Sequence, residues 1–330
     1  MSGNAVCRVG VVDCGTNTFT LHIADCFESG QWQSVFRQKR FVRLGLDSFR
    51  SGRLSPQRFR RGLDVLRSFH DSAANFNVDH VQAFGCSALR DASNGQDFVQ
   101  EASETGWNIE VLDGAAEAQW IHLGVRDSMS PHPLGDAHVI TVDIGGGSVE
   151  FILWNAGAVL GRWSLDLGVA RLTDWIKPAN PLRRADIESV FSVTDAALTG
   201  VLEAAERHPP TWMVGTSGAF NSLMSLQNPS ATWDDPAVAD EFSKEELLSR
   251  CAALSRMDKT EIGDIPGMHP DRVPYMAVAC VLIGHLLTRF PQVQRVFRSR
   301  NTLAEGVIVE AAAAWSANRT LPTNWAPLSE

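Results

Sequence analysis

One segment occurs twice in the sequence, and this duplication limits the possible folds more than any other feature. Residues 9–23 read VGVVDCGTNTFTLHI, and residues 139–153 read VITVDIGGGSVEFIL. Each copy is an apolar stretch that ends in aspartate, followed by a turn of small residues and a second apolar stretch. The two copies, around Asp13 and Asp143, predict two structures of the same design in the two halves of the chain.

Strand and helix patterns alternate around both copies. Ser55 and Pro56 suit a helix cap and the first helical position, and apolar residues recur after them at helical spacing as far as Phe69. Further strand patterns lie at 81–85, 109–112, 158–165, 211–214 and 293–297, and further helix patterns at 115–125, 183–207, 244–254, 273–289 and 302–315. This order predicts an α/β fold built from two related halves.

The length of 330 residues is about twice that of a typical domain and predicts two domains. The loop 127–136 contains two prolines and a glycine and is the predicted boundary. We therefore expect an N-terminal domain over 1–130 with the first turn and a C-terminal domain over 131–300 with the second. The last helix, within 301–330, is expected to pack back on the N-terminal domain.

The composition is that of a folded protein, with 44% hydrophobic and 20% charged residues. The net charge of −9 argues against nucleic acid or an anionic membrane surface as a partner. The longest apolar stretch, 276–287, is interrupted by Gly284 and His285 and is too short to span a bilayer. Six cysteines without a C-x-x-C pair, and a start without an export signal, predict buried, reduced thiols in a cytoplasmic protein.

The basic residues are twenty-five arginines and four lysines. The planar guanidinium group suits phosphate oxygens, and several arginines gather at 37–43, 58–61 and 295–300. Such runs are most often solvated surface, so they permit a phosphate-rich ligand without requiring one.

The repeated turn is a candidate phosphate-binding element. Small residues in a turn leave backbone N–H groups that can bind an anion, and Thr16, Asn17, Thr18 and Ser148 add side-chain donors. An aspartate at a strand end suits a hydrated Mg²⁺ ion. Ordinary hairpins use the same residue types, but two matching copies favour phosphate binding.

Taken in order, these and other motifs resemble the exopolyphosphatase and guanosine-pentaphosphate phosphohydrolase (Ppx/GppA) family, a branch of the actin and sugar-kinase superfamily. The motifs are DCGTNT at 13–18, SALRDASN at 87–94, GAAEA at 114–118, DIGGGS at 143–148, LGVARLT at 167–173 and GTSG at 215–218. The match is to the short, two-domain form. It implies two actin-like (ribonuclease H-like) domains with mixed sheets flanked by helices, and a cleft between them.

The resemblance also implies roles for individual residues. Glu117 matches the catalytic glutamate that takes a proton from the attacking water, and Arg90 and Glu150 match further catalytic positions. Asp13 and Asp143 match metal-binding carboxylates, with Mg²⁺ or Mn²⁺ as the expected cofactor. The expected phosphate-binding residues are Gly15, Thr16, Asn17, Thr18, Asn94, Gly145, Gly146, Gly147 and Ser148, and the expected nucleotide or substrate loop is Gly215, Thr216, Ser217 and Gly218.

Each of these residues also has a plainer interpretation from local sequence alone. Glu117 suits the start of a helix because of the helix dipole, Arg90 could be a surface salt-bridge partner, and Glu150 could be a solvent-facing strand residue. Cys86 and His122 are interpreted as packed side chains.

The sequence departs from the family pattern at several positions. Ala116 and Gln119 stand where the family has an acidic residue and an arginine, Ala304 replaces another arginine, and Ser217 stands where glycine is common. These changes spare the expected water-activating and metal positions, but they predict weaker or altered substrate binding.

The leading hypothesis is a Mg²⁺-dependent phosphohydrolase that releases terminal phosphate from inorganic polyphosphate or from guanosine pentaphosphate. Guanosine tetraphosphate is a further expected ligand, and the sequence does not separate these substrates. Two alternatives stay open: an ATP-dependent kinase of the same superfamily, and a weakly active or non-catalytic sensor that binds nucleotide or polyphosphate. A homodimer is one assembly that the sequence allows.

Overall fold

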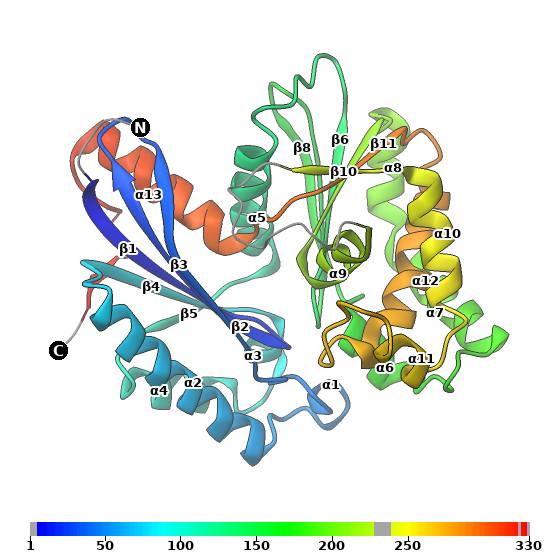
Figure 1. Cartoon of the computed structure of the whole chain (residues 1–330), viewed down its shortest axis with the longest axis horizontal. Helices are drawn as coiled ribbons and strands as arrows, with labels where there is room; N and C mark the ends of the chain where they lie inside the picture. The colour runs from blue at the N-terminus through cyan, green and yellow to red at the C-terminus, as the bar shows by residue number, and fades with distance from the viewer. Residues whose placement is uncertain (1–4, 228–238, 323–324, 329–330) are drawn as a thin grey trace. The chain divides into compact units, whose positions relative to one another are not determined.

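The computed structural model describes residues 5–227, 239–322 and 325–328, which form two compact units (Figure 1). Unit 1 comprises 1–127 and 303–330, and unit 2 comprises 128–302. The described residues of each unit contain one mixed six-stranded sheet flanked by helices. This architecture confirms the predicted α/β class.

The sheet of unit 1 is built around an antiparallel meander with parallel strands added beside its first strand. The meander comprises β1 (Ala5–Cys14), β2 (Thr18–Phe27) and β3 (Trp32–Phe41), and the added strands are β4 (His80–Gly85), β5 (Ile109–Val111) and a short antiparallel β12 (Ala326–Pro327). Strands β1 and β2 are buried on both faces along most of their length, which explains their nearly continuous apolar sequences.

The helices of unit 1 cover both faces of its sheet. They are α1 (Ser48–Ser51), α2 (Pro56–Asn75), α3 (Ser87–Asp91), α4 (Gly95–Ser103), α5 (Gly114–Ser128) and α13 (Leu303–Asn318). Helix α2 begins where the sequence predicts, because the Ser55 hydroxyl accepts a hydrogen bond from the Arg58 N–H at 3.4 Å. Helices α2 and α4 lie along one face, and α13 packs on β1, β2 and β3 from the other (Figure 1).

The sheet of unit 2 repeats the design of the first. Strands β6 (Val139–Ile144), β7 (Val149–Trp154) and β8 (Val159–Leu165) form the meander, and β9 (Trp212–Thr216), β11 (Arg295–Arg298) and β10 (Asp240–Phe242) extend it beside β6. In each unit the first meander strand pairs in parallel with the strand added beside it. The duplicated sequence therefore corresponds to a duplicated fold.

Helices flank this second sheet as well. They are α6 (Val169–Ile176), α7 (Arg184–Ala197), α8 (Thr199–Arg207), α9 (Ser217–Gln227), α10 (Lys244–Leu254), α11 (Lys259–Gly263) and α12 (Val273–Arg289). The single helix predicted over 183–207 is wrong, since it is divided at Leu198 into α7 and α8. Thr199 and Gly200 at the start of α8 have low helix propensity, which accounts for the break.

Two expectations about the chain as a whole can be compared with this fold. All six cysteines are free and buried, as predicted. Across the described part of the chain, no helix combines the length and apolar character needed to cross a bilayer.

Ser217, at the β9–α9 junction, has a backbone φ of 68°. This left-handed conformation costs a residue with a Cβ about 1–2 kcal/mol, whereas glycine adopts it freely. We expect Ser217→Gly to raise the free energy of unfolding by about 1 kcal/mol, measured by urea denaturation.

Ser222→Gly is the matched control, since Ser222 lies inside the same helix. Glycine there should lower the free energy of unfolding by about 1 kcal/mol. A loss of stability in both variants would contradict the argument from φ.

Candidate functional site

The two copies of the repeated sequence fold into the same turn. The Gly15 N–H donates to the Thr18 carbonyl at 3.1 Å, and the Gly145 N–H donates to the Ser148 carbonyl at the same distance. A Cβ atom on either glycine would lie 3.0 Å from that carbonyl oxygen, closer than almost any real contact. A side chain at the third position of either motif would therefore require the turn to open by a few tenths of an ångström.

In the first turn, a neighbouring segment holds the backbone carbonyls. The Gly45 N–H donates to Thr16 O at 2.9 Å, and the N–H groups of Val42 and Arg43 donate to Asn17 O at 3.0 and 2.8 Å. Within the described residues, the N–H groups of Thr16 and Asn17 have no hydrogen-bond partner. The turn thus has its carbonyls bound by protein and two amide donors available.

In the second turn, residues at the start of α6 hold the backbone carbonyls. The Ala170 N–H donates to Gly146 O at 2.9 Å, and the Arg171 side chain donates from Nε to Gly147 O at 2.6 Å. The N–H groups of Gly146 and Gly147 have no partner in the part of the chain that the structure describes. Successive backbone donors of this kind can bind an anion, and each turn has two of them.

Several turn side chains are buried polar groups. The Thr16 hydroxyl lies 3.0 Å from the Ser87 hydroxyl, so α3 is connected to the first turn. Asn17 is 8% exposed, and its buried Oδ1 has no hydrogen-bond partner. Ser148 is 3% exposed, whereas Thr18 is half-buried. A buried polar atom without a partner usually faces a ligand or water, which supports a polar ligand at the first turn.

Unit 1 also brings together the predicted acidic and basic residues. Asp13 lies near the end of β1, where the Cys86 thiol donates to its Oδ1 at 3.7 Å. Glu117 lies in the first turn of α5 and is 6% exposed. Its Oε2 is 3.3 Å from Nη1 of Arg90, which also donates to Leu112 O at 2.8 Å. Glu117 is thus at the start of a helix, as the local sequence predicts, and Arg90 is its ion-pair partner with a half-buried side chain.

Burial raises the pKa of Glu117 above the usual range of a glutamate. The Arg90 guanidinium and a hydrogen bond from Cys86 act in the opposite direction, so they oppose the shift without abolishing it. A carboxylate with a raised pKa is a stronger base than an exposed glutamate and can accept a proton from water more readily.

The acidic residues of unit 2 form a second pair. Asp143 on β6 is directly opposite Glu150 on β7, and their exposed fractions are 5% and 1%. The Ser164 hydroxyl donates to Glu150 Oε1 at 2.7 Å. Glu150 is therefore a buried neighbour of Asp143, and the solvent-facing interpretation from strand alternation is wrong.

Two predicted site residues use their polar atoms within the protein. The side-chain Oδ1 of Asn94 accepts a hydrogen bond from the Leu54 N–H at 2.8 Å, and its Nδ2 donates one to the Leu54 carbonyl at 3.1 Å. The Thr216 hydroxyl is fully buried and lies 3.2 Å from the carbonyls of Ser299 and Asn301. Both residues therefore connect loops in this structure, and substrate contact stays a prediction for each.

The rest of the predicted 215–218 loop packs tightly against α9 and α12. A Cβ on Gly215 would lie 2.2 Å from the Phe220 ring, and one on Gly218 would lie 1.8 Å from Nη1 of Arg272. Burial lowers the pKa of Arg272 to about 10. The packing of the Phe220 ring explains Gly215, whereas a side chain at position 218 would displace the end of the Arg272 side chain.

The candidate metal ligands do not form a closed cage. Among the described residues, no group of three or more His, Cys, Asp or Glu side chains could hold a metal ion by itself. Asp13 and Asp143 are each carboxylates at the end of a strand. A carboxylate of this kind, in either unit, fits Mg²⁺, which is commonly held by one or two carboxylates together with water and substrate phosphate oxygens.

The sequence reasoning gave no role to three residues that position the site. Ser87 holds Thr16, Arg171 holds the second turn, and Cys86 contacts Asp13. All three lie in or beside the motifs already noted, but only the fold reveals their partners.

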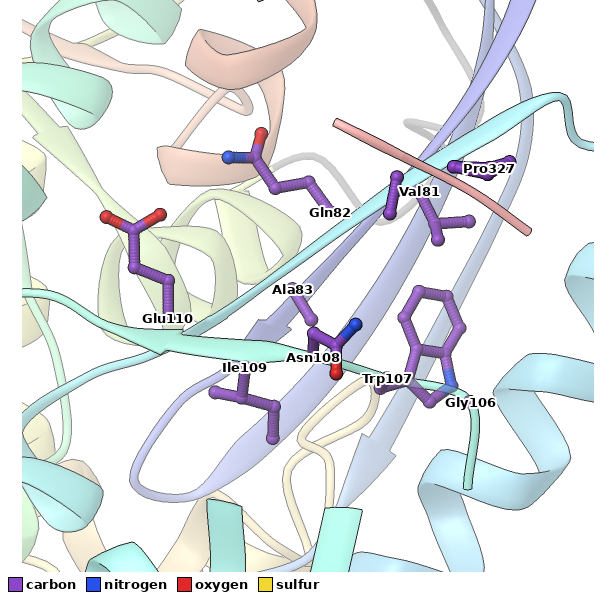
Figure 2. Close-up of a pocket in the computed structure, with 10 residues that line it drawn as sticks. Val81, Gln82, Ala83, Gly106, Trp107, Asn108, Ile109, Glu110 and Pro327 are labelled. Carbon is purple, nitrogen blue, oxygen red and sulfur yellow. The ribbon is translucent and has the colours of Figure 1, made fainter. Parts of the chain in front are cut away.

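A separate cavity of about 300 Å³ lies along β4 of unit 1 (Figure 2). Val81, Gln82, Trp107, Glu110 and Pro327 are among the residues that line it, and none of the predicted site residues does. This cavity is therefore separate from the predicted site residues.

Comparisons with known proteins identify the family and the fold of this chain. The Ppx/GppA phosphatase family matches residues 23–314. The chain is 26% identical to exopolyphosphatase 2 of Mycobacterium tuberculosis over 321 residues, covering 93% of this chain and 99% of that protein. It is 30% identical to exopolyphosphatase 1 of the same organism over 312 residues, covering 92% and 87%. The crystal structure of an exopolyphosphatase from Cytophaga hutchinsonii has a TM-score of 0.87 and 31% identity, covering 93% of this chain and 98% of that one.

The close approach of Gly168 to the second turn can be tested by mutation. A Cβ on Gly168 would lie 2.4 Å from backbone atoms of Gly146 and Gly147. We expect Gly168→Ala to lower the free energy of unfolding by about 2 kcal/mol through overpacking, measured by urea denaturation.

Gly157→Ala serves as the control, because a Cβ there would meet only Asn155 Oδ1, at 3.6 Å. That variant should stay within about 0.5 kcal/mol of the parent. Equal stability of the two variants would show that the turn tolerates a side chain at position 168.

Proposed function

This chain belongs to the Ppx/GppA phosphatase family, and we propose that it is a metal-dependent phosphohydrolase that releases the terminal phosphate of inorganic polyphosphate. Polyphosphate is the first choice because the relatives named exopolyphosphatase match more than nine-tenths of the chain. Guanosine pentaphosphate ends in the same phosphoanhydride group and is the second candidate.

The observation that carries this proposal is the pair of turns with unpartnered backbone donors. Thr16 and Asn17 in unit 1, and Gly146 and Gly147 in unit 2, offer N–H groups while their carbonyls are bound elsewhere. Phosphate oxygens are acceptors only, so a turn with free donors and bound carbonyls suits them. The Ser148 hydroxyl and the Asn17 amide add side-chain contacts.

Glu117 is the group that activates water in this proposal. Its carboxylate takes a proton from the attacking water as the new oxygen–phosphorus bond forms and the bridging bond to the remaining chain breaks. Arg90 holds the Glu117 carboxylate and offers positive charge to the transferred phosphoryl group. Positioning and charge supply most of the rate enhancement in phosphoryl transfer.

Asp13 in unit 1 and Asp143 in unit 2 would each offer a carboxylate to Mg²⁺ or Mn²⁺. The metal ion would neutralise negative charge on the phosphate oxygens. Glu150, which is buried opposite Asp143, would add a second negative charge beside that carboxylate. Both carboxylates are oxygen donors of the kind that these ions prefer.

The substrate is tested by comparing phosphate release from polyphosphate, guanosine pentaphosphate and ATP side by side with Mg²⁺. Release from polyphosphate with the highest kcat/KM supports the proposal, and the highest value for guanosine pentaphosphate transfers it to that substrate. ATP consumption that rises with a sugar or acid acceptor would identify a kinase instead. Tight binding without release at any Mg²⁺ concentration would identify a sensor.

The role of Glu117 predicts the effect of Glu117→Gln. The amide keeps the shape of the side chain but cannot accept the proton, so kcat should fall by about 100-fold or more while the melting temperature changes little. Glu104→Gln, an exposed change at the end of α4, should leave kcat unchanged. Turnover by Glu117→Gln at the rate of the parent would remove Glu117 from the mechanism.

The raised pKa of Glu117 predicts the pH dependence of the reaction. A general base acts when deprotonated, so kcat/KM should fall as the pH decreases through the pKa of Glu117. Because burial raises that pKa, the acid limb should lie at higher pH than the titration of an exposed glutamate. The measurement is kcat/KM against pH, and a profile flat down to the pH range of exposed glutamates would contradict the assignment.

A further inference from the structure

Three polar side chains of unit 1 form a hydrogen-bonded chain outside the candidate phosphate site. The Ser34 hydroxyl lies 2.9 Å from Nε2 of His22, and Nδ1 of His22 lies 2.9 Å from Oε1 of Glu305. His22 and Glu305 are buried, with exposed fractions of 2% and 1%, whereas Ser34 is exposed. A hydroxyl open to solvent is therefore connected through an imidazole to a buried carboxylate.

An irregularity in the sheet places Ser34 on this face. Arg37 on β3 is opposite His22 on β2, and Ser34 is opposite Ala24. Three steps along β3 therefore match two steps along β2, which is the geometry of a β-bulge. Without the extra residue, Ser34 and Arg37 would lie on opposite faces of the sheet, because side chains alternate along a strand. The bulge thus brings the Ser34 hydroxyl to the face on which His22 lies.

Helix α13 supplies the carboxylate, and further contacts hold the imidazole. Helix α13 packs on β2 and β3, and Glu305 lies in its first turn. Nη2 of Arg37 is 3.1 Å from the same Oε1 that contacts His22. The Trp32 ring meets His22 edge-on with ring centroids 5.7 Å apart, and the indole Nε1 donates to Oδ2 of Asp127 at 3.3 Å. The imidazole is therefore fixed in orientation by the folded chain.

The chemistry of these groups gives the hydrogen bonds a direction. An ionised carboxylate only accepts, so Nδ1 of His22 donates to Glu305. Nε2 of His22 is then unprotonated and accepts from the Ser34 hydroxyl. The guanidinium of Arg37 balances the charge of the carboxylate. Nucleophile, base and orienting carboxylate thus occur in the order that serine-dependent acyl transfer requires.

We propose that Ser34 is the nucleophile of a second active site, which hydrolyses carboxylic esters, with His22 as its base and Glu305 as a positioning residue. Ser34 Oγ attacks the ester carbonyl carbon while Nε2 of His22 takes the hydroxyl proton. The bond from that carbon to the alcohol oxygen then breaks, and the alcohol oxygen takes the proton from His22. Water attacks the acyl–serine bond by the same route, which releases the carboxylic acid and restores the Ser34 hydroxyl.

The position of Ser34 at the edge of the sheet suits this reaction. Among the described strands of unit 1, β3 is the edge strand beside β2. An edge strand has backbone N–H groups that point away from its sheet, and such donors can stabilise the oxygen that becomes negative during acyl transfer. Because Ser34 is exposed, an ester can approach it from solvent.

The reactivity of Ser34 is tested by treating the full chain with a fluorophosphonate, which phosphonylates activated serines. We expect mass spectrometry to find the label on Ser34, and Ser34→Ala to abolish it. His22→Gln should slow the labelling by about 100-fold or more, because the general base is lost. Glu305→Gln should slow it by about 10-fold or more, since an amide can donate to Nδ1 and favour the wrong tautomer. Thermal melting of each variant monitors folding separately.

Ser103→Ala is the matched control. Ser103 is also an exposed serine of unit 1, but its hydroxyl donates to the Gln100 carbonyl at 2.7 Å. Ser34 should be labelled at the parent rate in this variant. Absence of the label from Ser34 in the parent, or labelling of His22→Gln at the parent rate, would overturn the inference.

Turnover is measured with 4-nitrophenyl acetate, an ester with a small acyl group. The parent and Ser103→Ala should hydrolyse it about 10-fold faster or more than Ser34→Ala, because only the last lacks the nucleophile. Equal rates in all three proteins would show that Ser34 does not turn over an ester, and the proposed activity would be lost.

A third measurement leaves His22 and Glu305 unchanged, so it stands even if their variants fail to fold. The six natural cysteines are buried, and a thiol introduced at an exposed position is therefore the main site of alkylation. A neighbouring imidazole favours the thiolate. Ser34→Cys should react with iodoacetamide at neutral pH about 10-fold faster than Ser103→Cys, whereas equal rates would contradict the role of His22 as a base.

This inference does not rest on the proposed function. Ser34→Ala should release phosphate from polyphosphate at the parent rate, because its hydroxyl bonds His22, which is not part of the candidate phosphate site. If the parent releases no phosphate but is labelled at Ser34, the proposed function fails and the ester site stands. If the parent releases phosphate and Ser34 is not labelled, only the ester site fails.

Discussion

The candidate site depends on the binding of turn carbonyls by neighbouring segments of the protein. A carbonyl oxygen that faced the ligand would repel phosphate, so an anion site requires the carbonyls to be turned away and held. Segment 42–45 does this for the first turn, and the start of α6 with the Arg171 side chain does it for the second. The two units reach the same result with unrelated sequences, which indicates that the bound carbonyls matter more than the means of binding them.

The features that the sequence alone predicts are those that depend on residues close to them in the chain. The D-x-G turns, the Ser55 cap and the place of Glu117 in the first turn of α5 all follow from neighbours within a few positions. The partners of the turns could not be predicted in this way, because Asn17 meets Arg43, and Gly147 meets Arg171, only after the sheets have formed. The burial of Glu150 could not be predicted for the same reason. Alternation along a strand does not show which face of the sheet a helix or loop will cover.

Asn94 and Thr216 show that a residue in a family motif can have a structural role in the fold. Both lie in motifs that match an enzyme family, yet their polar atoms bridge protein loops at 2.8 to 3.2 Å. A motif residue can be required by the fold that carries a site as well as by the ligand. Residue type and spacing do not separate these two causes, whereas hydrogen-bond partners do.

The departures from the family pattern can be judged by what holds the neighbouring groups. Ala116 replaces an acidic residue beside Glu117, but its N–H is capped by Asp113 Oδ1 at 2.8 Å, and the Glu117 N–H bonds Asp113 O at 3.0 Å. The start of α5 is therefore fixed without an acid at position 116.

Ala304, which stands where the family pattern has an arginine, is 1% exposed. The adjacent Glu305 instead has Arg37 at 3.1 Å and His22 at 2.9 Å. Arg37, on strand β3, thus places a guanidinium beside this glutamate of helix α13. The backbone of Asp113 and the side chain of Arg90 bond Glu117 in this chain, and so the residues at 116 and 304 leave the proposed water-activating group in place.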